Sequence, residues 1–172
     1  KTNNNHYICV NTMQANKLAE EAIKNGVITQ LQNYENLTRE VKYGDENSKI
    51  DILLNDYHNN EKLNNKANCF VEVKSVTLYK GDGLGQFPDA VTTRGQKHLR
   101  ELMAIAATGQ RAVLLFVVLH NGIESVSAAA DVDPLYAQLL EQAVNSGVEV
   151  LAYSCNMSND ELVIKEQLPV LI

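Results

Sequence analysis

The stretch Phe70-Val71-Glu72-Val73-Lys74-Ser75-Val76 is the part of the sequence that best predicts both the fold and the chemistry. It lies in the segment 69–78, where apolar and polar residues alternate as they do in a β-strand. Glu72 and Lys74 are two residues apart, so their side chains point to the same face of a sheet. Charged groups in a core strand cost free energy unless they are paired or bind a metal. The stretch therefore predicts a strand with a chemically useful charged pair.

Two more strand-like segments precede this stretch. Residues 37–43 alternate in the same way, and residues 49–54 carry Asp51 as a lone carboxylate among isoleucines and leucines. The polar residues 44–48 predict a hairpin connection between them. The Asn- and Lys-rich residues 55–68 predict an exposed loop.

Apolar residues at helical spacing predict three helices outside these strands. The helices are expected over Gln14–Asn25, from Thr93 (with Gln96 completing a capping box) to Gly109, and from Asp133-Pro134 to Gly147. Further strands are expected at Arg111–Leu119, at Val148–Tyr153 and within Glu161–Ile172. The glycine-rich residues 79–95 predict an irregular loop, interpreted as a flap beside a metal site.

This order of elements predicts an α/β protein with a mixed central β-sheet flanked by helices on both faces. The 172 residues, of which 45% are hydrophobic, suit a single domain over 1–172. The longest apolar run, Ala112–Leu119, is far shorter than a membrane span of about 20 residues.

The net charge of −6 excludes a uniformly positive surface for binding nucleic acid. Contact with DNA then requires a local basic patch, a bridging metal or another domain. The three cysteines, Cys9, Cys69 and Cys155, form no CxxC motif, which favours reduced thiols and a cytoplasmic protein.

Glu40, Asp51, Glu72 and Lys74 are the candidate catalytic residues. Asp51 and Glu72, on neighbouring strands, could hold a hard cation such as Mg²⁺ or Mn²⁺. The lysine could orient a water molecule or stabilise developing negative charge, which suits hydrolysis of a phosphodiester. A purely structural alternative stays open, in which Glu72 and Lys74 form a surface ion pair and Asp51 ends a hairpin.

Arg94, Lys97, His98 and Arg100 form a candidate nucleic-acid-binding cluster at the start of the second helix. Helix N-termini favour phosphate, although a solvated helix face explains the same charges. Gln96, nearer the buried side of this helix, is a candidate supporting residue for the metal site.

Several long runs resemble the sugar fermentation stimulation protein family. They are the runs 39–44, 48–54, 71–78, 87–102 and 131–134. The family is similar to the PD-(D/E)xK nuclease superfamily and its restriction-endonuclease-like core. The resemblance implies that Asp51 and Glu72 bind metal, that Lys74 is catalytic, and that Glu40 takes an extra acidic role.

The chain departs from the family pattern at two points. Ile50 replaces the proline of the superfamily's name, and the family's N-terminal OB-type barrel is absent from the sequence given. The resemblance also implies DNA binding and a regulatory role in sugar (maltose) metabolism.

Three functions are therefore expected in descending order. The first is a Mg²⁺- or Mn²⁺-dependent nuclease that acts on DNA, and the second is a DNA-binding regulator of sugar metabolism genes that does not cut. The third is a partner-binding domain in which the acidic pocket holds a stabilising cation.

Overall fold

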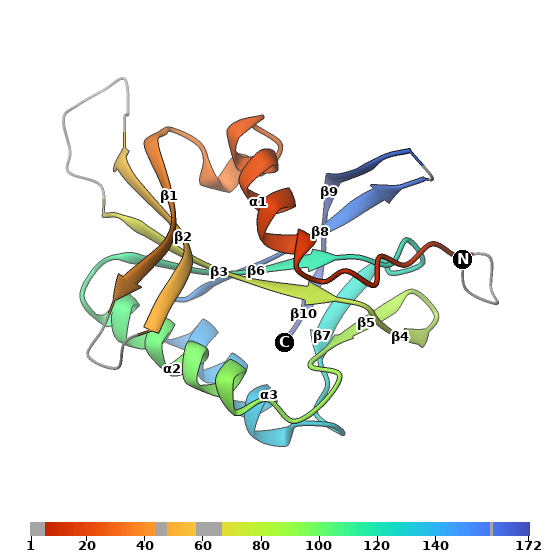
Figure 1. Ribbon diagram of the computed structural model, residues 1–172. Helices are drawn as coiled ribbons and strands as arrows, with labels where there is room; N and C mark the ends of the chain where they lie inside the picture. Colours follow the sequence, from red (N-terminus) through yellow and green to blue (C-terminus); the bar gives the residue numbers. More distant parts are fainter. Residues whose placement is uncertain (1–5, 44–47, 58–66, 159) are drawn as a thin grey trace.

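The computed structural model describes residues 6–43, 48–57, 67–158 and 160–172 (Figure 1). Residues 44–47 of the predicted hairpin connection and 58–66 of the predicted Asn-rich loop lie outside these ranges, whereas Ser48 and residues 55–57 belong to a strand and not to a connection or loop. Among the helices of the described ranges, none combines the length and the apolar character that a membrane span requires.

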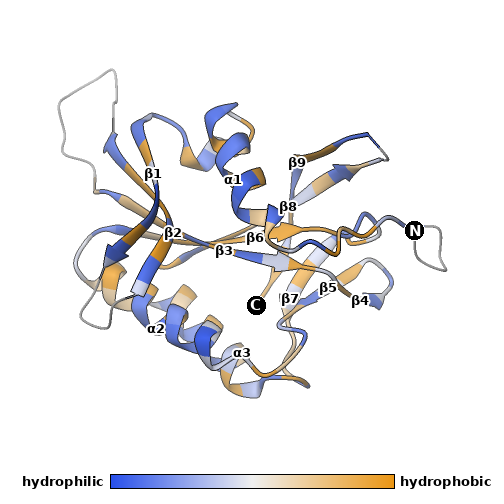
Figure 2. Cartoon of the chain, in the orientation of Figure 1, coloured by the Kyte–Doolittle hydropathy of each residue, from blue (hydrophilic) through white to orange (hydrophobic). Residues whose placement is uncertain are grey.

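A six-stranded mixed sheet forms the centre of the molecule. Its strands run in the spatial order β1 (Tyr34–Tyr43), β2 (Ser48–Tyr57), β3 (Cys69–Val76), β6 (Arg111–Val118), β8 (Glu149–Met157) and β9 (Leu162–Leu168). The three middle strands β3, β6 and β8 are parallel, whereas the outer pairs are antiparallel. Strand β6 is buried from Ala112 onward, as its continuous apolar sequence predicts (Figure 2).

Helices cover both faces of this sheet, which confirms the predicted class. Helix α1 (Gln14–Lys24) lies over one face, and α2 (Thr93–Ala107) and α3 (Pro134–Asn145) lie over the other (Figure 1). Each face has its own apolar core, because the buried residues of α1 belong to one cluster and those of α2 and α3 to another.

A second, four-stranded sheet was missed by the sequence interpretation. Its order is β10 (Val170–Leu171), β7 (Ser125–Ala128), β5 (Leu84–Phe87) and β4 (Leu78–Gly81), and a 3₁₀ turn, η1 (Thr29–Leu31), was missed as well. The predicted glycine-rich flap is thus the β4–β5 hairpin. Gly85 is buried in it, and a Cβ there would lie 2.7 Å from the side chain of Ile123. Glycine in this hairpin permits close packing, and the sequence does not distinguish that role from loop flexibility.

Strands β2 and β3 stop pairing next to Asp51 and Glu72. They pair at Leu54 with Cys69, Leu53 with Phe70, and Ile52 with Val71. In the described register the ladder stops there, one step before Asp51 would face Glu72. The described ends of β1 and β2 instead reach α2, where Tyr43 and Ser48 both donate hydrogen bonds to Glu101.

Asp133 joins α2 to α3. It caps α3 by accepting a hydrogen bond from the Tyr136 N–H at 2.9 Å, which confirms the predicted Asp-Pro start. It also accepts from the Thr92 N–H at 2.9 Å and from Gln96 Nε2 at 3.0 Å. The cap of α2 is Thr92, one residue before the predicted Thr93.

We expect Asp133→Ala to lower the free energy of unfolding by about 2–4 kcal/mol in urea denaturation at pH 7. The change removes a helix cap and leaves buried donors without an acceptor. Burial raises the pKa of Asp133, but hydrogen bonds from Thr92, Tyr136 and Gln96 outweigh it and hold the pKa below its ordinary value. The ionised form therefore stabilises the fold above that ordinary value, and the difference between variant and parent should shrink as the pH falls further. Asp133→Asn, which keeps one acceptor oxygen, should lower the free energy of unfolding less than Asp133→Ala does. Equal losses in the two variants would contradict this account.

Candidate functional site

Asp51 and Glu72 lie on either side of the fork between β2 and β3. The fork leaves the Val73 N–H without a strand partner, and Asp51 Oδ2 accepts its hydrogen bond at 2.8 Å. The other oxygen of Asp51 accepts from Asn16 Nδ2 of α1, also at 2.8 Å. Asp51 is therefore fixed from both a strand and a helix.

Glu72 is a buried carboxylate, with only 2% of its surface exposed. Its Oε1 lies 2.7 Å from Lys74 Nζ and in close contact with His98 Nδ1 of α2. Its Oε2 is buried and has no hydrogen-bond partner. An unsatisfied carboxylate oxygen is costly in a protein interior, so its presence marks a place where a further ligand is expected.

The pKa values of the two carboxylates are shifted in opposite directions. Burial, and then the charge of Glu72, raises the pKa of Asp51 against the hydrogen bonds from Val73 and Asn16. Burial also raises the pKa of Glu72, but His98 and Lys74 outweigh it and hold that pKa below its ordinary value. Opposed shifts in neighbouring carboxylates are typical of functional sites.

The donor set fits a hard divalent cation. Carboxylate oxygens are the ligands that Mg²⁺, Mn²⁺ and Ca²⁺ prefer, and Mg²⁺ usually retains several waters beside one or two carboxylates. The orphaned Oε2 of Glu72 supplies an unused acceptor for such an ion. Within the described ranges no group of three or more His, Cys, Asp or Glu side chains gathers for a metal, so Asp51 and Glu72 would share the ion with water.

The structure does not bring Glu40 to this group, whereas the sequence interpretation placed it there. Its side chain is 62% exposed, and its Oε2 lies 3.6 Å from Lys49 Nζ. Its backbone is also unusual, with a φ of 52° in the middle of β1. The carboxylate is therefore held at the outer edge of the sheet.

Two residues of α2 also differ from their predicted roles. His98 is only 6% exposed and contacts Glu72, so it lies with the carboxylates and not on the exposed face of α2 with Arg94 and Arg100. Gln96 is buried, and its Nε2 donates to Asp133 and not to the metal site. Arg94 and Arg100 are exposed as predicted, and Lys97 is half-buried.

Asn16 and the contact of His98 with Glu72 were missed by sequence reasoning. A polar residue on the buried side of an amphipathic helix was the available signal for Asn16, since it lies beside Ala15 and two positions before Leu18. His98 similarly lies between Gln96 and Leu99 on the buried part of α2. Neither signal identifies the strand that each residue meets.

The fold and the site together define a restriction-endonuclease-like α/β domain with an Asp and an ExK motif at the strand fork. A family model described as "Sugar fermentation stimulation protein RE domain" matches residues 13–161. The chain belongs to the sugar fermentation stimulation protein family.

Curated relatives and a solved structure agree with this membership. Sugar fermentation stimulation protein homologues of Shewanella woodyi and Shewanella halifaxensis are 61% and 58% identical over 95% and 99% of the chain, which covers 67% and 69% of their lengths. The structure of Pyrococcus furiosus SfsA in complex with Ca²⁺ matches 93% of the chain and 65% of its own, with a TM-score of 0.80 and 28% identity. The chain thus spans about two thirds of each of these proteins.

We expect the free energy of unfolding of Asp51→Asn, measured without added metal, to rise relative to that of the parent as the pH increases, on top of a pH-independent loss because the amide leaves one of the two donors that face Asp51 without an acceptor. The raised pKa of Asp51 means that its ionised form opposes folding at neutral pH. This relative gain should appear as the pH rises above the ordinary pKa of Asp51, be complete above its raised folded-state pKa, and be absent below the ordinary value. Urea denaturation between pH 3 and pH 8 measures this, and a difference from the parent that is constant across the range would contradict it.

Proposed function

We propose that the chain is a divalent-metal-dependent phosphodiesterase that cuts DNA. The proposal rests on one observation above all, the unpartnered Oε2 of the buried Glu72 beside Asp51 and Lys74. A buried carboxylate kept ionised has a ready use as a ligand for a cation. The fold class and the family membership support a DNA-related role.

Asp51 and Glu72 would hold Mg²⁺ or Mn²⁺. The P. furiosus relative, whose structure is titled as a complex with Ca²⁺, supports a divalent cation in this family. When bound, such an ion supplies a more acidic water and neutralises charge on a phosphoryl oxygen. Asn16 and the Val73 N–H would keep Asp51 in place for this purpose.

Lys74 is proposed to act on the phosphate or the attacking water. An ammonium group carries three N–H donors, and Lys74 Nζ lies 2.7 Å from Glu72 Oε1 and 3.0 Å from His98 Nδ1. His98 Nδ1 also contacts Glu72 Oε1, so it is not a settled acceptor for Lys74, and at least one ammonium donor is left for a substrate oxygen. A charged donor in a largely buried setting stabilises developing negative charge better than one in water.

DNA contact is proposed for Arg94, Lys97 and Arg100. All three lie on α2, the helix that also brings His98 to Glu72. The chain carries a net charge of −6, so a local cationic strip beside the site is the part of this chain suited to phosphate contacts.

A cleavage assay tests the proposed activity. Plasmid and single-stranded DNA are incubated with Mg²⁺ or Mn²⁺ and the parent protein, Asp51→Asn, Glu72→Gln or Lys74→Ala. We expect cutting by the parent and a loss of about a hundredfold or more in each variant, since each removes a group that acts on the metal or on developing charge. Glu40→Gln is the matched control, because the exposed Glu40 should be dispensable. Equal cutting by all the proteins would point to a contaminating nuclease and contradict the assignment.

Metal binding is measured separately by calorimetry with Mn²⁺ and Ca²⁺. We expect Asp51→Asn and Glu72→Gln to abolish binding and Glu40→Gln to leave it unchanged. Unchanged affinity in Asp51→Asn would contradict the site. Metal bound by a parent protein that cuts no DNA would favour the second candidate, a regulator that binds DNA without cutting it, for which the family's printed name is the supporting observation.

A further inference from the structure

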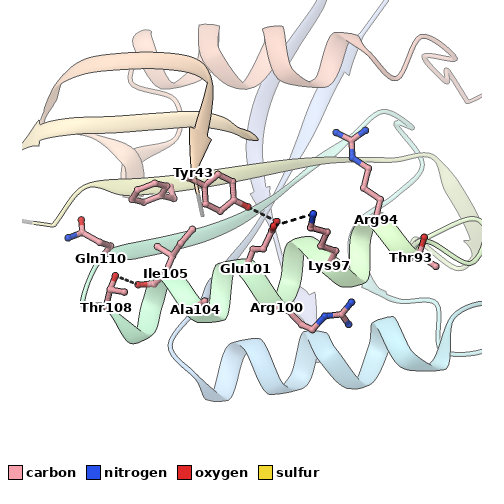
Figure 3. A pocket seen from close by; sticks show the side chains of 11 residues that line it. Tyr43, Thr93, Arg94, Lys97, Arg100, Glu101, Ala104, Ile105, Thr108 and Gln110 are labelled. Atoms are coloured by element: carbon pink, nitrogen blue, oxygen red, sulfur yellow. Dashed lines mark hydrogen bonds and ion pairs between the residues drawn. The ribbon is translucent and has the colours of Figure 1, made fainter. Parts of the chain in front are cut away.

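We propose that the groove between α2 and the β1–β2 hairpin binds unpaired nucleotides, so that the substrate is single-stranded DNA or a frayed end. This inference rests on the proposed function and names the substrate class of the same site. Tyr43 of β1, Phe70 of β3 and one long side of α2 line the groove (Figure 3). Its volume of about 860 Å³ lies within the range of sites that hold small ligands.

The inner part of the groove is apolar and aromatic. Tyr43 and Phe70 have ring centroids 6.1 Å apart and form one wall, and Ala104 and Ile105 of α2 form another. Such a surface stabilises flat apolar groups by stacking and burial. In a duplex the faces of the bases are covered by their neighbours, so only an unpaired base presents a face that fits here.

Cationic side chains occur along the α2 side of the groove. Its lining includes Arg94, Lys97 and Arg100 and a single carboxylate, that of Glu101. Three positive groups and one negative group give a local excess of two positive charges in a chain whose net charge is −6. This excess is complementary to the phosphates of a nucleotide strand.

Glu101 does not oppose an anionic ligand strongly, because its oxygens are already engaged. Oε2 accepts from Tyr43 at 2.9 Å, and Oε1 accepts from Ser48 and lies 3.7 Å from Lys97 Nζ. Figure 3 shows Tyr43 and Lys97 directed at Glu101 from opposite sides. The carboxylate thereby fastens the hairpin to α2 and shapes the groove.

The groove leads to the metal site. At its Arg94 end, Arg94 Nε lies 3.5 Å from His98 Nε2, and the other ring nitrogen of His98 contacts Glu72. A strand with a base against Phe70 can therefore place a neighbouring phosphate beside Asp51 and Glu72.

Fluorescence anisotropy with a labelled 12-nucleotide oligothymidine and a 12-base-pair duplex tests the groove, without divalent metal so that nothing is cut. We expect the parent to bind the single strand at least tenfold more tightly than the duplex. Phe70→Leu, which keeps an apolar side chain but loses the ring, should weaken single-strand binding about tenfold, because stacking on an aromatic ring contributes substantially per base. Ala104→Glu is a second variant at an exposed helical position that should fold normally. It should weaken binding to a similar extent by placing a negative charge in the groove.

The cationic side is tested by salt dependence. Lys97→Ala combined with Arg100→Ala should reduce the slope of log affinity against log salt by about 1.4, at about 0.7 per phosphate contact of a single strand. Lys17→Ala combined with Lys165→Ala is the matched control, since both lysines are exposed on other elements, α1 and β9. The control should leave the slope unchanged.

The outcomes separate this inference from the proposed function. Equal affinity for the two DNA forms, or single-strand binding unaffected by both Phe70→Leu and Ala104→Glu, would overturn the groove as a nucleotide site. Cleavage that depended on Asp51 would still stand in that case. Groove binding in a protein that neither binds metal nor cuts DNA would support the groove and contradict the nuclease.

Discussion

The hydrogen bond from the Val73 N–H to Asp51 is the contact on which the arrangement of this molecule depends. Where two strands of a sheet part, backbone groups lose their partners, and a buried unpaired N–H costs free energy comparable to a lost hydrogen bond. The Asp51 carboxylate replaces the missing strand carbonyl. The β1–β2 hairpin can then leave the sheet at Ile52 and cross to α2. That crossing creates both the fork that holds the carboxylates and the groove beside them.

The site is assembled from elements that cover opposite faces of the sheet. Asn16 reaches Asp51 from α1, and His98 reaches Glu72 from α2. Both contacts fix carboxylates whose charges are costly in a half-buried setting. The packing of α1 and α2 on the sheet therefore positions the two carboxylates and also buries the apolar core. The chain tolerates an unsatisfied carboxylate oxygen on Glu72. Asp133, the cap of α3, instead accepts hydrogen bonds from Thr92 and Tyr136.

The main sheet and the three helices could be predicted from the sequence because each has a local signal, whereas the grouping of Asp51, Glu72 and Lys74 rested on the family resemblance. Alternation identified the strands, and Asp133-Pro134 identified a helix start. The second sheet could not be predicted, since its strands are two to four residues long and its pairings join segments far apart in the chain. The positions of Glu40, Gln96 and His98 depend on which strand or helix each side chain meets. Sequence periodicity gives the face of an element and not its partner.

Glu40, which the sequence interpretation placed at the carboxylate site, has its structural effect at the edge of the main sheet. Strand β1 is an outer strand of the main sheet, and the free side of such a strand offers backbone groups to any other extended chain. Glu40 interrupts this side with a left-handed backbone conformation and an exposed negative charge that pairs with Lys49. An incoming strand would meet a break in the extended backbone together with a charge that it would have to desolvate. Such an interruption makes the described edge of the sheet a poorer template for pairing with another extended chain.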